Sequence, residues 1–202
     1  MTFAQRQRSA LVSLLRGLGP FAPTKCGGWQ TQDLAAHLYV REHRPAALPG
    51  IGIPRFAPLT ERIQRESLHS LGYPALLDAL EQPAWFMRPI DKLVNTSELF
   101  IHHEDVLRAN GGSQVLTPAE QQELWPVARM LARKAQVGYG GRVLLTRTDT
   151  AQQIAMGTGN RPIHVSGLPS ELVLLLSGRE ADVTVGGEPA ALEAWREALS
   201  GL

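Results

Sequence analysis

Apolar residues recur at three- and four-residue spacing through the first two thirds of the chain, which is the period of an amphipathic helix. This pattern predicts helices at residues 3–18, 31–44, 56–71, 91–110 and 118–136. Proline and glycine gather between these segments, as in HRPAALPGIGIP and NGGSQVLTP, and favour long, irregular connections. Because each helix has one apolar face to bury, we expect residues 1–137 to form a helical bundle.

The pattern changes at the GYGG sequence that begins at residue 138. The segments RVLLTRT, QQIAMG, PIHVSG and ADVTVGG are short runs bounded by turn residues, as is typical of strands. Helices are predicted at residues 168–179, where Pro169 suits the first turn and Gly178 the C-terminal cap, and at 188–199. The sequence therefore predicts an α+β protein in which a small α+β domain, residues 138–202, follows the bundle.

Composition and charge exclude several classes of protein. The chain has 202 residues, of which 44% are hydrophobic, so it can bury a sizeable core. Its 20 Lys and Arg residues balance 19 Asp and Glu residues, which gives no electrostatic footprint for nucleic acid or an anionic membrane surface. No apolar run approaches the roughly 18 residues of a membrane-spanning helix, and the N-terminus lacks signal-peptide features, so we expect a cytoplasmic protein.

The stretch ELFIHHED, residues 98–105, concentrates groups that bind metals. At about 100° per residue on a helix, Glu98, His102 and Asp105 share one narrow stripe within the apolar face, whereas His103 projects elsewhere. A buried carboxylate or imidazole is costly unless it is paired or bound to a metal. Glu98 and His102 approach one point, as the histidines of H-E-x-x-H do, and together suit a divalent transition metal. A His–Glu hydrogen bond without metal would also satisfy both groups.

A third ligand is expected from the helix at residues 31–44. His37 lies there between Leu34 and Val40, inside an apolar stripe. Taken alone, His37 would be a hydrogen-bonded core histidine, and its combination with Glu98 and His102 is what favours a ligand. Three protein ligands, His37, Glu98 and His102, are typical of catalytic rather than structural zinc sites. Asp105, one turn beyond His102, is interpreted as a carboxylate that orients an imidazole. The one cysteine in the sequence excludes an internal disulfide and a multi-cysteine metal site.

Four further side chains in these segments have two interpretations each. Arg41 and Arg44 share the face of His37 and would suit an anion site, although we favour solvated arginines at a helix C-terminus. Cys26, in KCGGW, is either a reactive thiol near the metal or a small turn residue, and we favour the second. Phe100 lies opposite the stripe, which predicts a cover from the C-terminal domain or from a second subunit and leaves monomer and homodimer open.

Three motifs resemble the mycothiol-dependent maleylpyruvate isomerase family, a branch of the DinB-like four-helix metalloproteins. They are CGGWQTQDLAAHL at residues 26–38, ELFIHHEDVLRA at 98–109 and GLPSELVLLLSGR at 167–179. Their order and spacing cover nearly the whole chain. The HHED doublet is closer to an uncharacterised metal-binding branch of the family than to the isomerase itself.

The resemblance implies a divalent ion, usually zinc, bound by His37, Glu98 and His102, with Asp105 at the family's acidic position. It also implies a low-molecular-weight thiol such as mycothiol, which acts as a thiolate at the metal, and leaves the small-molecule substrate open. One hypothesis is therefore a metal-dependent thiol S-transferase or isomerase. The other is a metal-binding or structural protein without turnover, which a fourth protein ligand from His103, Asp105 or Cys26 would favour.

Overall fold

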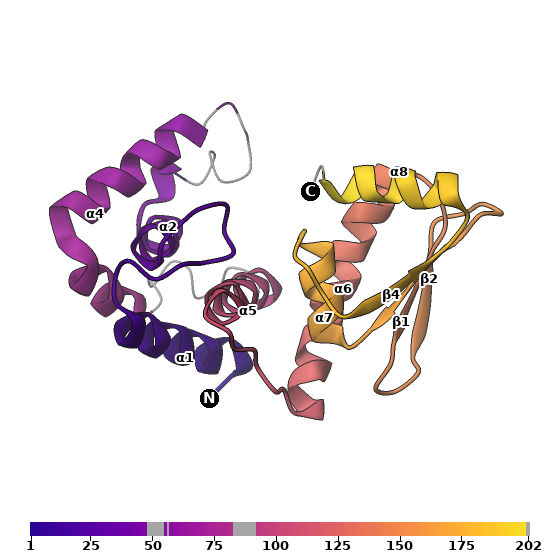
Figure 1. Ribbon diagram of the computed structural model, residues 1–202, viewed down its shortest axis with the longest axis horizontal. Coiled ribbons are helices and arrows are strands. Elements are labelled where there is room, and N and C mark those ends of the chain that lie inside the picture. The colour runs from indigo at the N-terminus through magenta and orange to yellow at the C-terminus, as the bar shows by residue number, and fades with distance from the viewer. Residues whose placement is uncertain (48–54, 56, 83–91, 201–202) are drawn as a thin grey trace. The chain divides into compact units, whose positions relative to one another are not determined.

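The computed structural model describes residues 1–47, 55, 57–82 and 92–200 (Figure 1). It is a mixed α+β structure that divides into two compact units, Met1–Gln114 and Val115–Leu202. The first unit contains helices α1 (Phe3–Leu18), α2 (Thr31–His43), α4 (Ala57–Leu80) and α5 (Lys92–Ala109), with a short 3₁₀ helix η1 (Pro45–Ala47). The second contains α6 (Pro118–Tyr139), α7 (Pro169–Leu176), α8 (Pro189–Ser200) and the strands β1 (Val143–Arg147), β2 (Gln153–Met156), β3 (Ile163–Gly167) and β4 (Val183–Gly186). The predicted α+β class is confirmed.

The α-helices among the described residues of the first unit form a bundle, in which α2 lies between α4 and α5 (Figure 1). Helix α2 packs along α4, and α1 packs along α5. Fully buried leucines from α1, α2 and α4 fill the core, among them Leu15, Leu34 and Leu76. This packing gives α2 neighbours on more than one side, so a polar residue on its inner face lies among other helices.

Helix α4 is longer than the sequence pattern predicts. The predicted helix ends at residue 71, but α4 continues to Leu80 through a kink at Gly72, whose φ of 76° and ψ of 160° are non-helical. Glycine accepts this conformation because it has no Cβ, and Pro74 then starts the second segment. That segment adds Leu77 and Leu80 to the core. The predicted helix starts at residues 56 and 91 lie outside the described residues.

The face of α5 opposite the predicted stripe of Glu98, His102 and Asp105 is covered by α1 of the same unit. Phe100 is 1% exposed and its ring centroid lies 6.4 Å from that of Phe3. His103 is also buried there, and its Nδ1 lies 2.8 Å from the side-chain oxygen of Gln7. A cover from another domain or subunit, as the sequence suggested, is therefore not required to bury Phe100.

The second unit is built around a four-stranded sheet of order β2-β1-β3-β4. Strands β1 and β3 are parallel, and β2 and β4 pair antiparallel at the two edges. Helix α6 packs on α7 and α8, which places it with the strands, whereas the sequence pattern grouped it with the bundle. That residues 1–137 and 138–202 form two separate domains stays a prediction. Across the described residues, the helices are too short or too polar to traverse a lipid bilayer.

Candidate metal centre

Helices α2 and α5 bring together the side chains of His37, Glu98 and His102. One ligand atom from each lies within 4.8 Å of those of the other two. On α5, the Nε2 atom of His102 is 3.6 Å from Oε2 of Glu98, as expected for side chains four residues apart on a helix. The imidazoles of His37 and His102 meet edge to face, with centroids 5.4 Å apart. A small ion would therefore have donors from both helices.

Asp105 orients the imidazole of His102. Its Oδ2 atom lies 3.1 Å from Nδ1, and the carboxylate is almost completely buried. When Nδ1–H donates to this oxygen, the lone pair of Nε2 is directed to the side of Glu98, which is the arrangement that supports a metal-ligating histidine. Burial acts to lower the pKa of His102, but hydrogen bonds to Asp105, Cys26 and Glu98 outweigh it and raise this pKa well above its usual value.

His37 is held between Trp29 and a glutamine of α4. The Trp29 ring centroid is 5.2 Å from that of the imidazole, and the side-chain amide nitrogen of Gln64 is 3.1 Å from Nδ1. Rotation of this amide by half a turn presents its oxygen instead, which accepts a hydrogen bond from Nδ1–H and leaves the Nε2 lone pair available to a metal. Burial, together with the charge on His102, lowers the pKa of His37 to about 4, so this imidazole is neutral at neutral pH.

Arg41 neutralises part of the charge of Glu98. Its Nε atom lies 3.6 Å from Oε2 of Glu98, and both terminal nitrogens donate to Oδ1 of Asn95 at 3.2 Å. Burial would raise the pKa of Glu98, but His102, Arg41 and His37 outweigh burial and lower this pKa to about 2. The carboxylate is therefore ionised and able to bind a cation.

The interpretation of Arg41 and Arg44 as solvated arginines is wrong for Arg41. Arg41 is only 5% exposed and not solvated, because α5 supplies partners that helical periodicity cannot reveal. Arg44 is exposed, as expected, and its guanidinium carbon lies 5.9 Å from the ring centroid of Tyr39. An anion-binding role for Arg41 and Arg44 stays a prediction.

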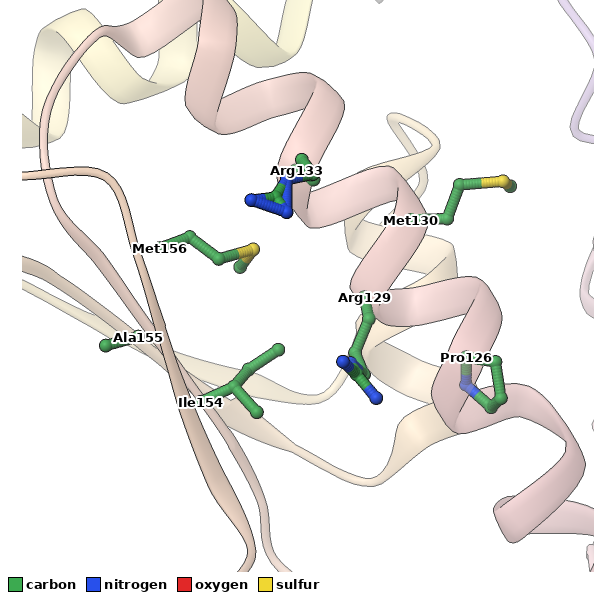
Figure 2. Close-up of a pocket in the computed structure, with 7 residues that line it drawn as sticks. All are labelled: Pro126, Arg129, Met130, Arg133, Ile154, Ala155 and Met156. Atoms are coloured by element: carbon green, nitrogen blue, oxygen red, sulfur yellow. The ribbon is translucent and has the colours of Figure 1, made fainter.

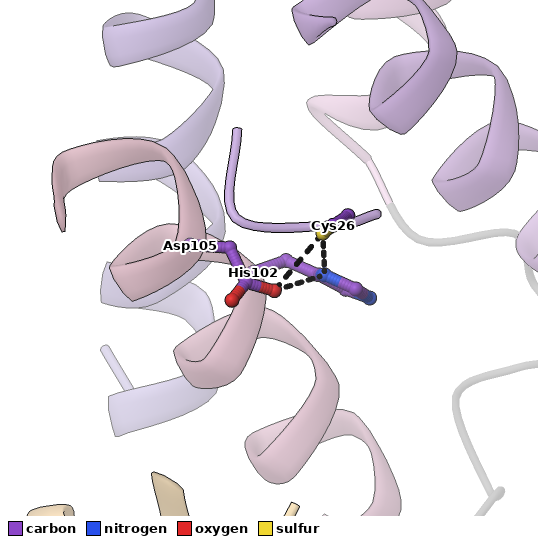
Figure 3. Close-up of side chains that lie close together, drawn as sticks. All are labelled: Cys26, His102 and Asp105. Carbon is purple, nitrogen blue, oxygen red and sulfur yellow. Dashed lines mark hydrogen bonds and ion pairs between the residues drawn. The ribbon is translucent and has the colours of Figure 1, made fainter. Parts of the chain in front are cut away.

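Cys26 lies closer to the site than the preferred interpretation of a simple turn residue implies (Figure 3). Its Sγ atom is 3.1 Å from Oδ2 of Asp105 and 3.6 Å from Nδ1 of His102. Gln64 and Trp29, which contact His37, were also not identified as site residues from the sequence. The only available signal was that Cys26 and Trp29 directly precede the His37 helix.

Cavities adjoin the described helices in both units. One, of about 250 Å³, lies between α2 and α4 and is lined by Trp29, Asp33, Ala36, Glu61, Gln64, Arg65 and Leu68. Since Trp29 and Gln64 also contact His37, this cavity borders the candidate metal centre.

Another cavity, of about 490 Å³, lies in the second unit between α6 and β2 (Figure 2). Arg129 and Arg133 extend from α6 toward β2, and the apolar side chains of Ile154 and Met156 extend from β2 toward the helix. This groove is lined by no nucleophile and by no group that exchanges protons near neutral pH. It is therefore a poorer candidate for a reaction centre than the cluster on α2 and α5.

Comparison with known proteins shows similarity in structure rather than in sequence. No protein-family model and no curated protein sequence matches the chain. The chain is similar to the crystal structure of the mycothiol-dependent maleylpyruvate isomerase, with 17% identity and a TM-score of 0.53, and to a histidine-to-alanine mutant of that isomerase, with 15% identity and a TM-score of 0.54. Both matches cover 91% of this chain and 90% of the other. At such identities the likeness establishes a shared fold.

Proposed function

We propose that this protein binds a divalent metal ion, zinc in preference, through His37, Glu98 and His102, and uses it in a thiol-dependent isomerisation or S-transfer on a small molecule. We further propose that it belongs to the mycothiol-dependent maleylpyruvate isomerase family, in its uncharacterised metal-binding branch. The observation that carries the proposal is the convergence of these three donors from two helices within 4.8 Å. The shared fold with an isomerase described as mycothiol-dependent supports the choice of thiol.

The donor set suits zinc of the catalytic type. Two imidazoles and one carboxylate are ligands that zinc accepts, and three protein ligands leave a position for a small molecule. Among the described residues, the three candidates for a fourth ligand do not join this group. His103 is hydrogen-bonded to Gln7. Cys26 and Asp105 lie on the Nδ1 side of His102, whereas Glu98 lies on the Nε2 side. This arrangement favours an enzyme over a metal-binding protein without turnover.

The surrounding residues prepare the ligands for this role. Asp105 fixes the ring of His102, and Gln64 contacts Nδ1 of His37. His102 and, to a smaller extent, Arg41 lower the pKa of Glu98 and keep it ionised. When bound, a divalent ion lowers the pKa of a coordinated thiol and makes the thiolate available near neutral pH. The neighbouring cavity of about 250 Å³ is smaller than the roughly 300–1,000 Å³ typical of pockets for drug-sized ligands, which favours a small substrate.

The experiment is a pair of calorimetric titrations of the full-length apo protein. Zinc is titrated first, and mycothiol is then titrated with and without zinc. Wild-type protein should bind mycothiol only when zinc is present. Glu98→Gln keeps the side-chain shape but removes the charge, and it is made together with Cys26→Ser so that the nearby thiol cannot supply a ligand. This double variant should lose most of the zinc affinity of Cys26→Ser, whereas the exposed control Glu66→Gln in the same background should retain it. Mycothiol binding that ignores zinc would refute the mechanism, and equal zinc affinity of the double variant and Cys26→Ser would refute the ligand set.

A further inference from the structure

The His102 imidazole has a second group of donors on its Nδ1 side (Figure 3). Sγ of Cys26, Oδ2 of Asp105 and Nδ1 of His102 form a triangle with sides of 3.1, 3.1 and 3.6 Å. These three atoms lie within 4.8 Å of one another, as do the three donors on the Nε2 side. One histidine is thus common to two sets of ligands.

The thiol is held at this position by bonds that do not involve the sulfur atom. The Cys26 amide donates to Oγ1 of Thr24 at 3.1 Å, and its carbonyl accepts from the Trp29 amide at 2.9 Å. The neighbouring amide of Lys25 donates to the backbone oxygen of Asp105 at 3.0 Å, which ties the turn to α5. The placement of Cys26 beside His102 is therefore a property of the backbone fold.

Two hydrogen-bond donors share one acceptor at this position. Both the Cys26 thiol and Nδ1 of His102 contact the same oxygen, Oδ2 of Asp105. A tetrahedral zinc ion, with bonds of about 2.3 Å to sulfur and about 2.0–2.1 Å to nitrogen or oxygen, separates its ligand atoms by about 3.3–3.6 Å. The observed triangle is close to this size, so a cation that replaces both protons could contact all three atoms after small shifts.

We propose that Cys26, Asp105 and Nδ1 of His102 form a second cation position, which takes a thiophilic divalent ion such as Zn²⁺, Co²⁺ or Cd²⁺. We also infer that the two positions exclude each other, because a neutral imidazole has one N–H and one lone pair. This exclusion rests on the proposed function, whereas the second position stands without it. A soft ion at Cys26 would withdraw His102 from the site on its other side.

The protons balance in each state. With an ion at His37, Glu98 and His102, the imidazole proton stays on Nδ1, and this N–H donates a hydrogen bond to Asp105. With an ion at the second position, the imidazole proton is on Nε2, on the side of Glu98, whose Oε2 is 3.6 Å away. The thiol proton of Cys26 and the proton that the ion displaces from Nδ1 of His102 are then released to solvent. Each carboxylate therefore ligates the ion in one state and faces the imidazole N–H in the other.

Cobalt(II) titration of the reduced, full-length apo protein tests this assignment, since a thiolate ligand gives Co²⁺ a charge-transfer band in the near ultraviolet. His37→Phe keeps a ring at position 37 but removes its donor, so it should bind one Co²⁺ with the full band. Cys26→Ser should bind one Co²⁺ without the band. Wild type should bind one Co²⁺ in total, with an intermediate band. Cys26→Ala, with circular dichroism of every variant, provides a second test should serine disturb the turn.

The outcomes separate the two proposals. A His37→Phe protein that folds but shows no thiolate band would overturn the second position. Two equivalents of Co²⁺ bound by wild type would overturn mutual exclusion. A folded Cys26→Ser protein that binds no Co²⁺ would instead refute the site at His37, Glu98 and His102, while a band in the other variants would leave the second position in place.

Discussion

The adjacent histidines of α5 differ in every contact that bears on metal binding, so replacing them one at a time tests the proposed ligand set. His102 faces Glu98 and His37, whereas His103 faces Gln7 of α1. Glutamine is a suitable replacement at both positions because it is polar and of similar length. We expect His102→Gln to abolish stabilisation by zinc and His103→Gln to preserve it.

The size of the effect follows from linkage between binding and folding. Zinc at 100 times its dissociation constant stabilises the native state by about 2.7 kcal/mol. For a chain of this length, about 2–4 °C in Tm corresponds to each kcal/mol, so zinc should raise the wild-type Tm by about 5–11 °C. In His103→Gln the new amide can donate a hydrogen bond to Gln7, so the free energy of unfolding of the zinc-free protein should fall by only about 1 kcal/mol.

The assay is differential scanning calorimetry of chelator-treated protein, with and without zinc, for wild type and both variants. The informative quantity is the zinc-induced rise in Tm and not Tm itself, because either substitution can change stability without metal. An equal loss of this rise in both variants would refute the assignment of His102 as the ligand. A full rise in His102→Gln would remove this histidine from the site altogether.

Three further predictions concern the surroundings of the site. Asp105→Asn should weaken zinc binding by about 10- to 100-fold in a chelator competition, because an amide supports the His102 imidazole less strongly than a carboxylate; unchanged affinity would count against the orienting role. In the apo protein the pKa of His102 is raised and that of His37 is lowered to about 4, so near neutral pH zinc must displace a proton from His102 but not from His37. Zinc affinity should therefore increase with pH until the pKa of His102 is passed, and calorimetry in buffers of different ionisation enthalpy should detect the released proton; binding without proton release at pH 6 would contradict this. Arg8→Met should cost about 3–5 kcal/mol in urea unfolding, because it leaves the fully buried Glu42 without its two hydrogen bonds of 2.7 Å, and the double variant Arg8→Met, Glu42→Leu should recover most of that loss.

Helical periodicity predicted the relations within α5 correctly. The side chains of Glu98, His102 and Asp105 lie along one side of the helix, because the turn of a helix fixes the angle between positions four and seven residues apart. The same reasoning placed His103 on another face. That these groups bind metal stays a prediction, since periodicity and proximity describe geometry and not occupancy.

The sequence was less informative wherever a contact depends on a second element. The burial of Arg41 depends on Asn95 and Glu98 of α5, and the environment of His37 depends on Gln64 of α4. Periodicity gives the direction of a side chain around its own helix axis but not the identity of the helix that covers it. Cys26 is the extreme case, because a turn residue has no period and its neighbours are fixed only by the folded backbone.

The charges around the proposed ligands give a further reason to expect an anionic partner. Within the group formed by Glu98, Asp105, Arg41 and the two imidazoles, two carboxylates and one guanidinium leave one net negative charge when both imidazoles are neutral. A divalent cation changes this to one net positive charge in a region that is largely shielded from water, where uncompensated charge is costly. A monoanion such as a thiolate restores neutrality, whereas a neutral thiol does not. The charges of the site would therefore act in the same direction as the proposed metal ion, and both would favour binding of a thiol in its deprotonated, nucleophilic form.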